Sequence, residues 1–296
     1  MKFNTFLGIL AILFWSTNVA FSRSLIEQMG VLTSGAAIFL LGGGLSLAVV
    51  AWRARGLGFL KRSSKKYLFG CGLVFVINTV ALQVAIGLSA SRTQTIIVGL
   101  INYLWPALSL WFSIFILGKK ARWFLPVGLV ISLGGMWLAS TNGEVLNIRE
   151  VLQPATLGVY AIALLAAVTW GLYSNWSRKW AGGASDSGAV PLFLICTGAC
   201  LGLVRLFVPE VTIFSAGTAL ELAYMVIFPT ILAYIFWDAA MRKGRMITVV
   251  ALSYFIPLFS TIISALRLGV NLRPEIWLAA GLIIVGAYFS RAAIME

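Results

Sequence analysis

Residues 103–118 read YLWPALSLWFSIFILG, and residues 254–269 read YFIPLFSTIISALRLG. In each stretch a tyrosine stands three residues before a proline, and a Leu-Gly pair ends an otherwise apolar run. Each stretch belongs to an apolar segment of about 20 residues, the length that crosses a lipid bilayer as a helix. The two stretches therefore suggest that the chain contains the same membrane-spanning segment twice.

A second pair of segments supports an internal duplication. Ser22-Arg23 follows Trp15 at the same spacing at which Ser177-Arg178 follows Trp170. Both pairs come in the same order along the chain and at nearly the same separation. We therefore expect two repeats, residues 1–155 and residues 156–296.

The composition indicates that most of the chain lies in a membrane. Of the 296 residues, 60% are hydrophobic and 10% are charged, whereas soluble domains are about 45–50% apolar and about 25% charged. This composition excludes a soluble enzyme, a disordered protein and a receptor with a large water-exposed domain. Hydropathy predicts an all-α integral membrane protein with ten transmembrane helices. The predicted runs are 4–22, 32–52, 67–88, 94–117, 123–140, 157–176, 189–208, 218–240, 246–266 and 275–292.

Ten runs place five spans in each repeat, and an odd number of spans inverts the second repeat relative to the first. Inverted repeats around a central cavity are the architecture of secondary transporters, which bind substrate near the middle of the membrane and alternate access between its two sides. The alternative is a duplication that only records evolutionary history.

The net charge of +13 is explained by topology. We assign alternate connections to two sides, with the N-terminus on the first side, and most of the 22 basic residues then fall on the first side. The second side holds Arg23, Arg92, Arg149, Arg205, Arg267 and Arg273. Because basic residues collect in cytoplasmic loops, both termini are predicted to be cytoplasmic. Binding to nucleic acid is not needed to explain the charge.

The first run also has features of a secretory signal peptide. Lys2 precedes the apolar segment, and Asn18-Val19-Ala20 loosely resembles a cleavage site. The matching segment around Trp170 favours a retained first span instead.

The segment VGLINYLWP at residues 98–106 resembles the fourth helix of the YddG-type aromatic amino acid exporters. These form part of the EamA-like branch of the drug/metabolite transporter superfamily. The segments LFWST at 13–17 and SYFIP at 253–257 fit the same family. The resemblance covers nearly the whole chain. It implies a multi-pass exporter of the bacterial inner membrane for aromatic amino acids and similar amphipathic metabolites, with a central cavity lined by helices 1, 3, 4, 6, 8 and 9.

Polar side chains deep in the apolar runs are candidates for substrate binding, because they normally face a cavity or a neighbouring helix. They are Asn18, Asn78, Gln83, Asn102, Asn175 and Ser253. Asn78, Asn102 and Ser253 are predicted to bind substrate, and Asn18 and Asn175 are predicted to serve packing. An amide accepts from an ammonium or donates to a carboxylate without bringing charge into the membrane. The alternative for each is a hydrogen bond between helices.

Aromatic side chains within the runs are the second group of candidates, since rings stack on an aromatic substrate and attract its ammonium. The predicted substrate-binding rings are Trp15, Tyr103, Trp105, Trp170, Tyr234, Trp237 and Tyr254. The alternative is that these bulky rings only pack in the core of the helix bundle. Aromatic residues at span ends are predicted to anchor the protein at the membrane interface. These are Trp52, Trp123, Trp180 and Trp277.

Prolines and small residues predict where helices bend and where they pack closely. Pro106, Pro229 and Pro257 lie within spans and are predicted to be hinges, or alternatively static kinks. Gly128-x-x-x-Ser132 and Gly198-x-x-x-Gly202 are predicted to allow close contact between helices.

Ionisable groups are scarce inside the runs. The chain has no histidine, and the acidic residues within apolar runs are Asp238 and Glu221. Proton-coupled transporters usually need a deep carboxylate or histidine. We therefore expect facilitated export without obligatory proton coupling, with Asp238 paired to Arg242 four residues later.

The sequence also bears on functions other than aromatic amino acid export. The runner-up is a drug/metabolite exporter for another metabolite or drug, with or without proton coupling. An intramembrane enzyme lacks the paired catalytic groups that it needs, and an open channel lacks a ring of charges or carbonyls. Cys71, Cys196 and Cys200 lie in apolar runs and indicate packing, so neither a metal nor a cofactor is expected. The expected partners are a small-molecule substrate and the lipid bilayer, for a monomer or weak oligomer.

Overall fold

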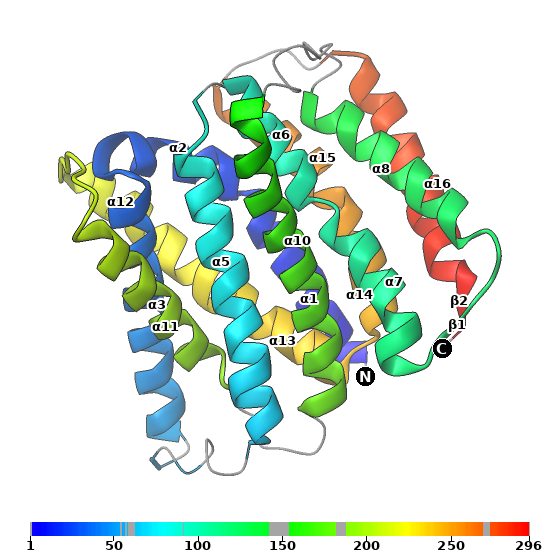
Figure 1. Ribbon diagram of the computed structural model, residues 1–296, viewed down its shortest axis with the longest axis horizontal. Coiled ribbons are helices and arrows are strands. Elements are labelled where there is room, and N and C mark those ends of the chain that lie inside the picture. The colour runs from blue at the N-terminus through cyan, green and yellow to red at the C-terminus, as the bar shows by residue number, and fades with distance from the viewer. Residues whose placement is uncertain are drawn as a thin grey trace.

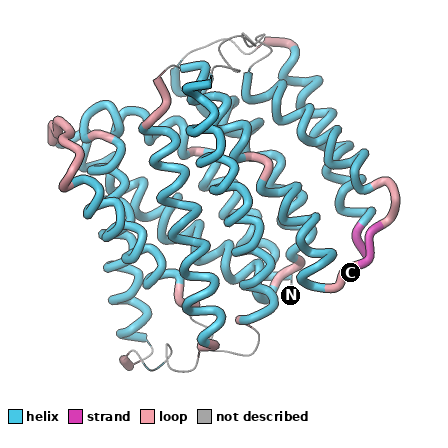
Figure 2. Tube along the Cα trace, in the orientation of Figure 1, coloured by secondary structure: helices cyan, strands magenta, loops and turns pink. Residues whose placement is uncertain are grey.

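The chain folds into a bundle of helices (Figure 1), as its composition predicts. The computed structural model describes residues 2–53, 55–56, 58, 63–90, 92–141, 154–181, 188–268 and 273–295. Gly269 of the second repeated stretch lies outside the described residues, as do Arg149 and the side chains of Arg23, Arg92 and Arg267. The described strands are two residues long each and pair near the C-terminus (Figure 2).

The elements of the first half follow the first five predicted runs. In chain order they are α1 (Lys2–Ser16), α2 (Asn18–Met29), α3 (Val31–Arg53), the π-helical segment η1 (Lys66–Cys71), α5 (Gly72–Gly87), α6 (Arg92–Asn102), α7 (Trp105–Leu117), the strand β1 (Lys120–Ala121) and α8 (Leu125–Thr141). Gly118 ends α7 with φ of 65°, a left-handed conformation that glycine adopts without strain.

The elements of the second half follow the other five runs. They are α10 (Pro154–Trp180), α11 (Val190–Arg205), α12 (Ala216–Met225), the π-helical segment η2 (Val226–Leu232), α13 (Ala233–Lys243), α14 (Met246–Leu252), the 3₁₀ turn η3 (Ser253–Phe255), α15 (Ile256–Leu268), α16 (Glu275–Ala293) and the strand β2 (Ile294–Met295).

Every predicted apolar run therefore falls on helical structure. Among the described residues, 7 helical stretches are long and apolar enough to cross a membrane. Shorter apolar helices lie in the first, fifth and seventh runs, at Lys2–Ser16, Leu125–Thr141 and Val190–Arg205. The protein is thus a helical, multi-pass membrane protein, and the count of ten crossings stays a prediction.

Two of the runs are interrupted where a proline follows. In run 94–117, α6 ends at Asn102 and α7 begins at Trp105. In run 246–266, the turn η3 separates α14 from α15. Pro106 and Pro257 each occupy the second position of the helix that follows. The missing N–H needs no helical partner there, so each proline is tolerated at the start of the helical segment that follows the interruption.

Hydrogen bonds between connections group the helix ends on two sides. On the side of the N-terminus, the N–H of Arg245 donates to Thr5 Oγ1 at 3.0 Å. On the other side, the N–H of Ile213 donates to the carbonyl of Gln28 at 2.7 Å. Figure 1 shows both termini at the same end of the bundle, where β2 pairs antiparallel with β1.

Four helix pairs dominate the packing: α3 with α11, α8 with α16, α1 with α13, and α5 with α10. Glycines permit the close approach in two of these pairs. A Cβ added at Gly198 would lie 2.6 Å from the backbone N of Leu40, and one added at Gly128 would lie 2.6 Å from the backbone N of Ser290. At Gly202 the nearest atom would be 3.9 Å away. Close packing of α11 on α3 therefore depends on Gly198 and not on Gly202.

Glu210 fixes the start of α3 on the second side. Its carboxylate accepts the N–H groups of Leu32 and Thr33 at 2.9 and 2.8 Å, and Arg205 lies 3.5 Å away. Partial burial raises the pKa of the Glu210 carboxyl, but these hydrogen bonds and the Arg205 charge outweigh it, so the pKa lies below its usual value. The carboxylate thus satisfies N–H groups that the first turn of α3 leaves without helical partners.

Candidate substrate cavity

A cavity of about 310 Å³ lies between the two halves of the chain. Most of its lining side chains come from α2, α3, α5 and α6 of the first half and from α10, η2 and α13 of the second. The lining residues are Trp15, Asn18, Leu25, Ile26, Ser34, Ile38, Phe39, Asn78, Thr79, Leu82, Gln83, Ile86, Thr95, Gly99, Asn102, Tyr103, Trp105, Trp170, Met225, Pro229, Thr230, Tyr234 and Ile256.

The cavity is closed toward the first side and reaches toward the second side. At its closed end Trp105 and Trp170 are 5% and 4% exposed. At the opposite end the lining includes Ile86 near the end of α5 and the exposed Thr95 near the start of α6. Both positions are close to the connection between α5 and α6 on the second side.

Four rings form the closed end, and we call Trp15, Trp105, Trp170 and Tyr234 the aromatic floor. The centroid of Trp170 lies 5.5 Å from that of Trp15, 6.3 Å from that of Trp105 and 5.8 Å from that of Tyr234, all in edge-to-face geometry. The floor therefore combines rings from both repeats, and edge-to-face pairing is a favoured arrangement for aromatic side chains.

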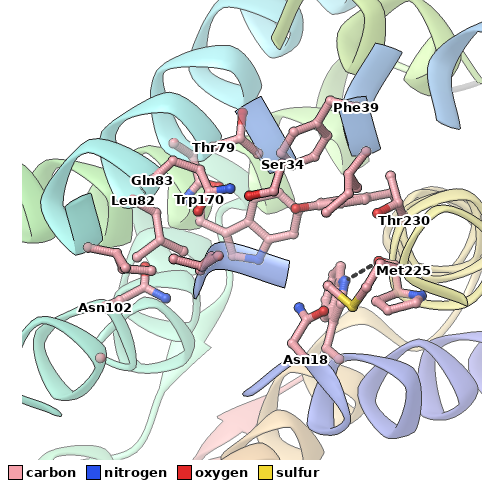
Figure 3. Close-up of a pocket in the computed structure, with 18 of the residues that line it drawn as sticks. Asn18, Ser34, Phe39, Thr79, Leu82, Gln83, Asn102, Trp170, Met225 and Thr230 are labelled. Carbon is pink, nitrogen blue, oxygen red and sulfur yellow. Dashed lines mark hydrogen bonds between the residues drawn. The ribbon is translucent and has the colours of Figure 1, made fainter. Parts of the chain in front are cut away.

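A hydrogen bond across the repeats fixes the first of these rings. Trp15 Nε1 donates to the carbonyl of Pro229 at 3.0 Å, drawn as the dashed line in Figure 3. Pro229 lies inside the π-helical segment η2. Such segments leave irregular backbone hydrogen bonding, and here a carbonyl of η2 receives a side-chain donor from α1.

Four amide side chains line the cavity outside the floor, and we call Asn18, Asn78, Gln83 and Asn102 the amide collar. Figure 3 shows Asn102 on one side of the Trp170 indole and Asn18 on the other. Asn78 Nδ2 donates to the carbonyl of Ala166 at 2.7 Å, so this residue also links α5 to α10.

Two of the collar amides have unused hydrogen-bonding capacity. Among the described residues, the buried Oδ1 atoms of Asn18 and Asn102 have no hydrogen-bond partner. A buried polar atom without a partner costs about 1–3 kcal/mol. A ligand group that donates hydrogen bonds to these two oxygens, such as an ammonium, would recover that cost.

The structure brings together seven of the ten predicted substrate-binding residues. Those that line the cavity are Asn78, Asn102, Tyr103, Trp105, Trp15, Trp170 and Tyr234. Trp237, Ser253 and Tyr254 are buried and do not line it. Trp237 lies behind the floor, 5.2 Å from the ring centroids of both Trp15 and Trp105.

The positions of Ser253 and Tyr254 outside the cavity follow from the interruption of run 246–266. The hydroxyl of Ser253 donates to the carbonyl of Val250 in the preceding helix α14 at 2.6 Å, and Tyr254 belongs to the same turn as Ser253. Of the predicted hinges, Pro229 lines the cavity, whereas Pro106 and Pro257 are buried away from it.

Several lining residues were not predicted. Asn18 lines the cavity, although packing was expected of it, whereas Asn175 donates to the carbonyls of Ser109 and Gly171 as a packing residue would. Ser34, Ile38 and Phe39 of α3 were missed because span 2 was not expected at the cavity. Gln83 stood among the deep polar residues without an assigned role; it lies four residues after Thr79, so the two share one face of α5, and both line the cavity.

The predicted pairing of Asp238 with Arg242 is confirmed. Arg242 Nε lies 2.7 Å from Asp238 Oδ2, and the two side chains are 5% and 1% exposed. Neither residue lines the cavity. Within the described part of the chain, no group of three or more His, Cys, Asp or Glu side chains is arranged to hold a metal ion.

The known proteins that this chain resembles are named as transporters or exporters. The profile of the "EamA-like transporter family" matches residues 2–141 and 157–292. "Aromatic amino acid exporter YddG" of Escherichia coli (strain K12) is 31% identical, over 96% of this chain and 94% of that protein. The protein of the same name from Salmonella typhimurium is 30% identical over the same shares. A solved crystal structure of a protein, 25% identical, superposes with a TM-score of 0.81 over 98% of this chain and 97% of that one.

Proposed function

Because the chain belongs to the EamA-like transporter family, we propose that it is a secondary transporter that exports aromatic amino acids and related amphipathic metabolites. Membership of a transporter family makes it a transport protein and not an enzyme. The observation that carries the substrate class is the cavity itself, in which an aromatic floor faces an amide collar. The relatives named as aromatic amino acid exporters support the same class.

The cavity suits a molecule with one flat apolar end and one polar end. The substrate ring packs against Trp170 and Tyr234 of the floor, where each aromatic contact contributes about 0.5–1.5 kcal/mol beyond area burial. The ammonium and carboxylate reach the amides of Asn78 and Asn102 and the hydroxyl of Tyr103. Amides recognise both groups of a zwitterion without a buried charge of their own.

Ten crossings arranged as two inverted repeats, residues 1–155 and 156–296, are part of this proposal. The packing supports it, because α1 contacts α13 as α10 contacts α5, which are equivalent pairs once the second half is laid on the first. The remaining major pairs, α3 with α11 and α8 with α16, join equivalent helices. The separate matches to residues 2–141 and 157–292 are a further support.

The proposal assigns alternating access to the interrupted helices. Pro106 and Pro257 stand at matched interruptions in the two repeats, and Pro229 stands in η2 against Trp15. Motion at these points tilts half-helices and leaves the rest of each span packed, which is how discontinuous helices serve transporters.

The proposed location is the bacterial inner membrane with both termini cytoplasmic. The excess of basic residues on the first side supports this orientation. With that orientation the structure has its cavity directed toward the outside of the cell. We propose that the protein works as a monomer or weak oligomer.

The function is tested by efflux from liposomes that contain the purified protein. Phenylalanine, tyrosine and tryptophan are expected to leave faster than threonine, with saturable rates. Linear, unsaturable flux would indicate a channel. Saturable efflux without preference for aromatic substrates would favour the rival exporter of another metabolite.

Export is proposed to be facilitated, without obligatory proton coupling. Asp238 is buried, hydrogen-bonded and outside the cavity, so it is poorly placed to carry a proton with the substrate. An imposed pH gradient is expected to change phenylalanine efflux by less than about 2-fold, a free-energy effect below about 0.5 kcal/mol. Accumulation that requires the gradient and disappears in Asp238→Asn would contradict this.

A further inference from the structure

We propose that a buried polar cluster holds the first side of the cavity closed and makes the second-side-open form the resting state of the empty carrier. The Asp238 cluster consists of Tyr67, Tyr173, Asp238 and Arg242. This inference rests on the transport function proposed above, and it assigns that transport cycle a gate that lies outside the substrate cavity.

The cluster connects four helical elements through one carboxylate. Asp238 Oδ1 accepts hydrogen bonds from the hydroxyls of Tyr67 in η1 and Tyr173 in α10, both at 3.0 Å. Asp238 Oδ2 accepts Arg242 Nε at 2.7 Å within α13. The hydroxyl of Tyr67 in turn accepts the N–H of Ala189, at the start of α11, at 3.3 Å.

The cluster lies directly behind the aromatic floor. Tyr173 stacks on Trp170 with ring centroids 5.0 Å apart, and Trp237, the neighbour of Asp238, contacts the rings of Trp15 and Trp105. Phe75 and Phe193 fill the space between, each in contact with the ring of Tyr173. The floor and the Asp238 cluster therefore form one packed block between the cavity and the first side.

This block has to separate before the cavity opens to the first side. While it is closed, the carboxylate and guanidinium are out of water, and each hydrogen bond to the carboxylate is stronger than one between neutral groups. Opening exchanges these bonds for bonds to water. The bonds of the cluster therefore set how often the empty carrier opens to the first side.

In the described part of the first repeat, no buried carboxylate occupies the position that corresponds to Asp238. The helix that corresponds to α13 under the proposed duplication is α5, and its sequence GLVFVINTVALQVAIG contains no charged residue. The second side therefore closes without a buried carboxylate from this position. The two closures differ in strength, and the structure has the stronger one formed.

Cys71 is a native reporter of this gate. It lies four residues after Tyr67 in η1, and both are buried, with Cys71 0% exposed. Replacement of the other cysteines, Cys196→Ala and Cys200→Ala, leaves Cys71 as the single thiol. Its rate of alkylation by N-ethylmaleimide in liposomes then measures opening of the first side and requires no substrate.

A second reporter measures the opposite side. Gly99 lines the cavity, and a Cβ added there would meet no atom within 4 Å. Gly99→Cys, with all three native cysteines replaced, therefore places a single thiol in the open cavity. Opening of the gate raises the labelling rate of Cys71 and leaves that of Gly99→Cys unchanged or lower, whereas a loosened structure raises both rates.

The test compares Tyr67→Phe and Tyr173→Phe, each of which removes one hydroxyl from the Asp238 cluster. Each variant is expected to label Cys71 roughly 10-fold faster, from the loss of one hydrogen bond to a charged group, and Gly99→Cys no faster, because the second-side-open form remains the more populated one. Asp238→Asn is expected to act in the same direction and more strongly. The tyrosine variants decide the matter if Asp238→Asn does not fold.

Tyr160→Phe is the matched control, because the buried hydroxyl of Tyr160 on α10 has no hydrogen-bond partner among the residues that the structure describes. It is expected to leave both labelling rates unchanged. Unchanged labelling in Tyr67→Phe and Tyr173→Phe, or an increase at both reporters, would overturn the gate. If the tyrosine variants label Cys71 faster without labelling Gly99→Cys faster, but the protein transports no aromatic amino acid, the proposed substrate is rejected and the gate is retained.

Discussion

Replacement of Trp170 by alanine is expected to reduce phenylalanine efflux at least about 10-fold while threonine efflux falls much less. Trp170 is the ring that contacts the other three members of the aromatic floor, with centroid distances between 5.5 and 6.3 Å. Loss of one or two substrate–ring contacts at about 0.5–1.5 kcal/mol each corresponds to that factor. Initial efflux rates, normalised to the amount of reconstituted protein, give the measurement.

Two further variants separate substrate binding from damage to the fold. Trp277→Ala removes a ring of the same size from α16, where the side chain is 74% exposed, and is expected to leave the ratio of the two rates unchanged. Trp170→Phe keeps a ring and should retain part of the preference. An equal loss of phenylalanine and threonine efflux in Trp170→Ala would show that the floor does not select aromatic substrates.

Gly286→Val is expected to give the largest loss of stability. Gly286 lies where α16 crosses α8, and a Cβ there would stand 2.4 Å from the backbone N of Ser132 and 2.8 Å from the carbonyl of Gly128. Backbone atoms cannot rotate away, so the helices must separate. Overpacking typically costs about 1–3 kcal/mol of the free energy of unfolding. Because the valine side chain is branched and meets backbone atoms, we expect a cost at or above the upper end of that range. Thermal unfolding in detergent and the yield of monodisperse protein give the readout.

Gly281→Val on the same helix is the matched control for this prediction. A Cβ at Gly281 would meet no atom within 4 Å, so the same change in size is expected to have little effect. Similar losses in both variants would mean that helix propensity, and not contact with α8, determines the outcome.

The sequence predicted the helices better than their interruptions. Hydropathy identifies apolar runs because lipid requires nearly every residue of a span to be apolar. It contains no information on where a helix stops and restarts inside the membrane. Pro106 and Pro257 mark those points, since each is the second residue of the helix that follows the interruption.

Interruption also bears on which predicted site residues line the cavity. Asn78 and Asn102 were identified because a deep amide is rare, and the rings of the aromatic floor were identified because both repeats contribute aromatic residues within their spans. Ser253 is also a deep polar residue, so the sequence did not distinguish it from Asn78 and Asn102. In the structure its hydroxyl donates to the carbonyl of Val250 and is not directed at the cavity. Ser34 and Phe39 of α3 had no distinguishing signal, because a serine or phenylalanine in a span is as common against a neighbouring helix as against a cavity.

The small volume of the cavity bears on stoichiometry. Pockets that enclose drug-sized molecules range from about 300 to about 1,000 Å³, and this one, at about 310 Å³, is at the lower limit. One molecule of the proposed substrate, an amino acid with an aromatic ring, fills such a space, so we expect each cycle to carry one molecule.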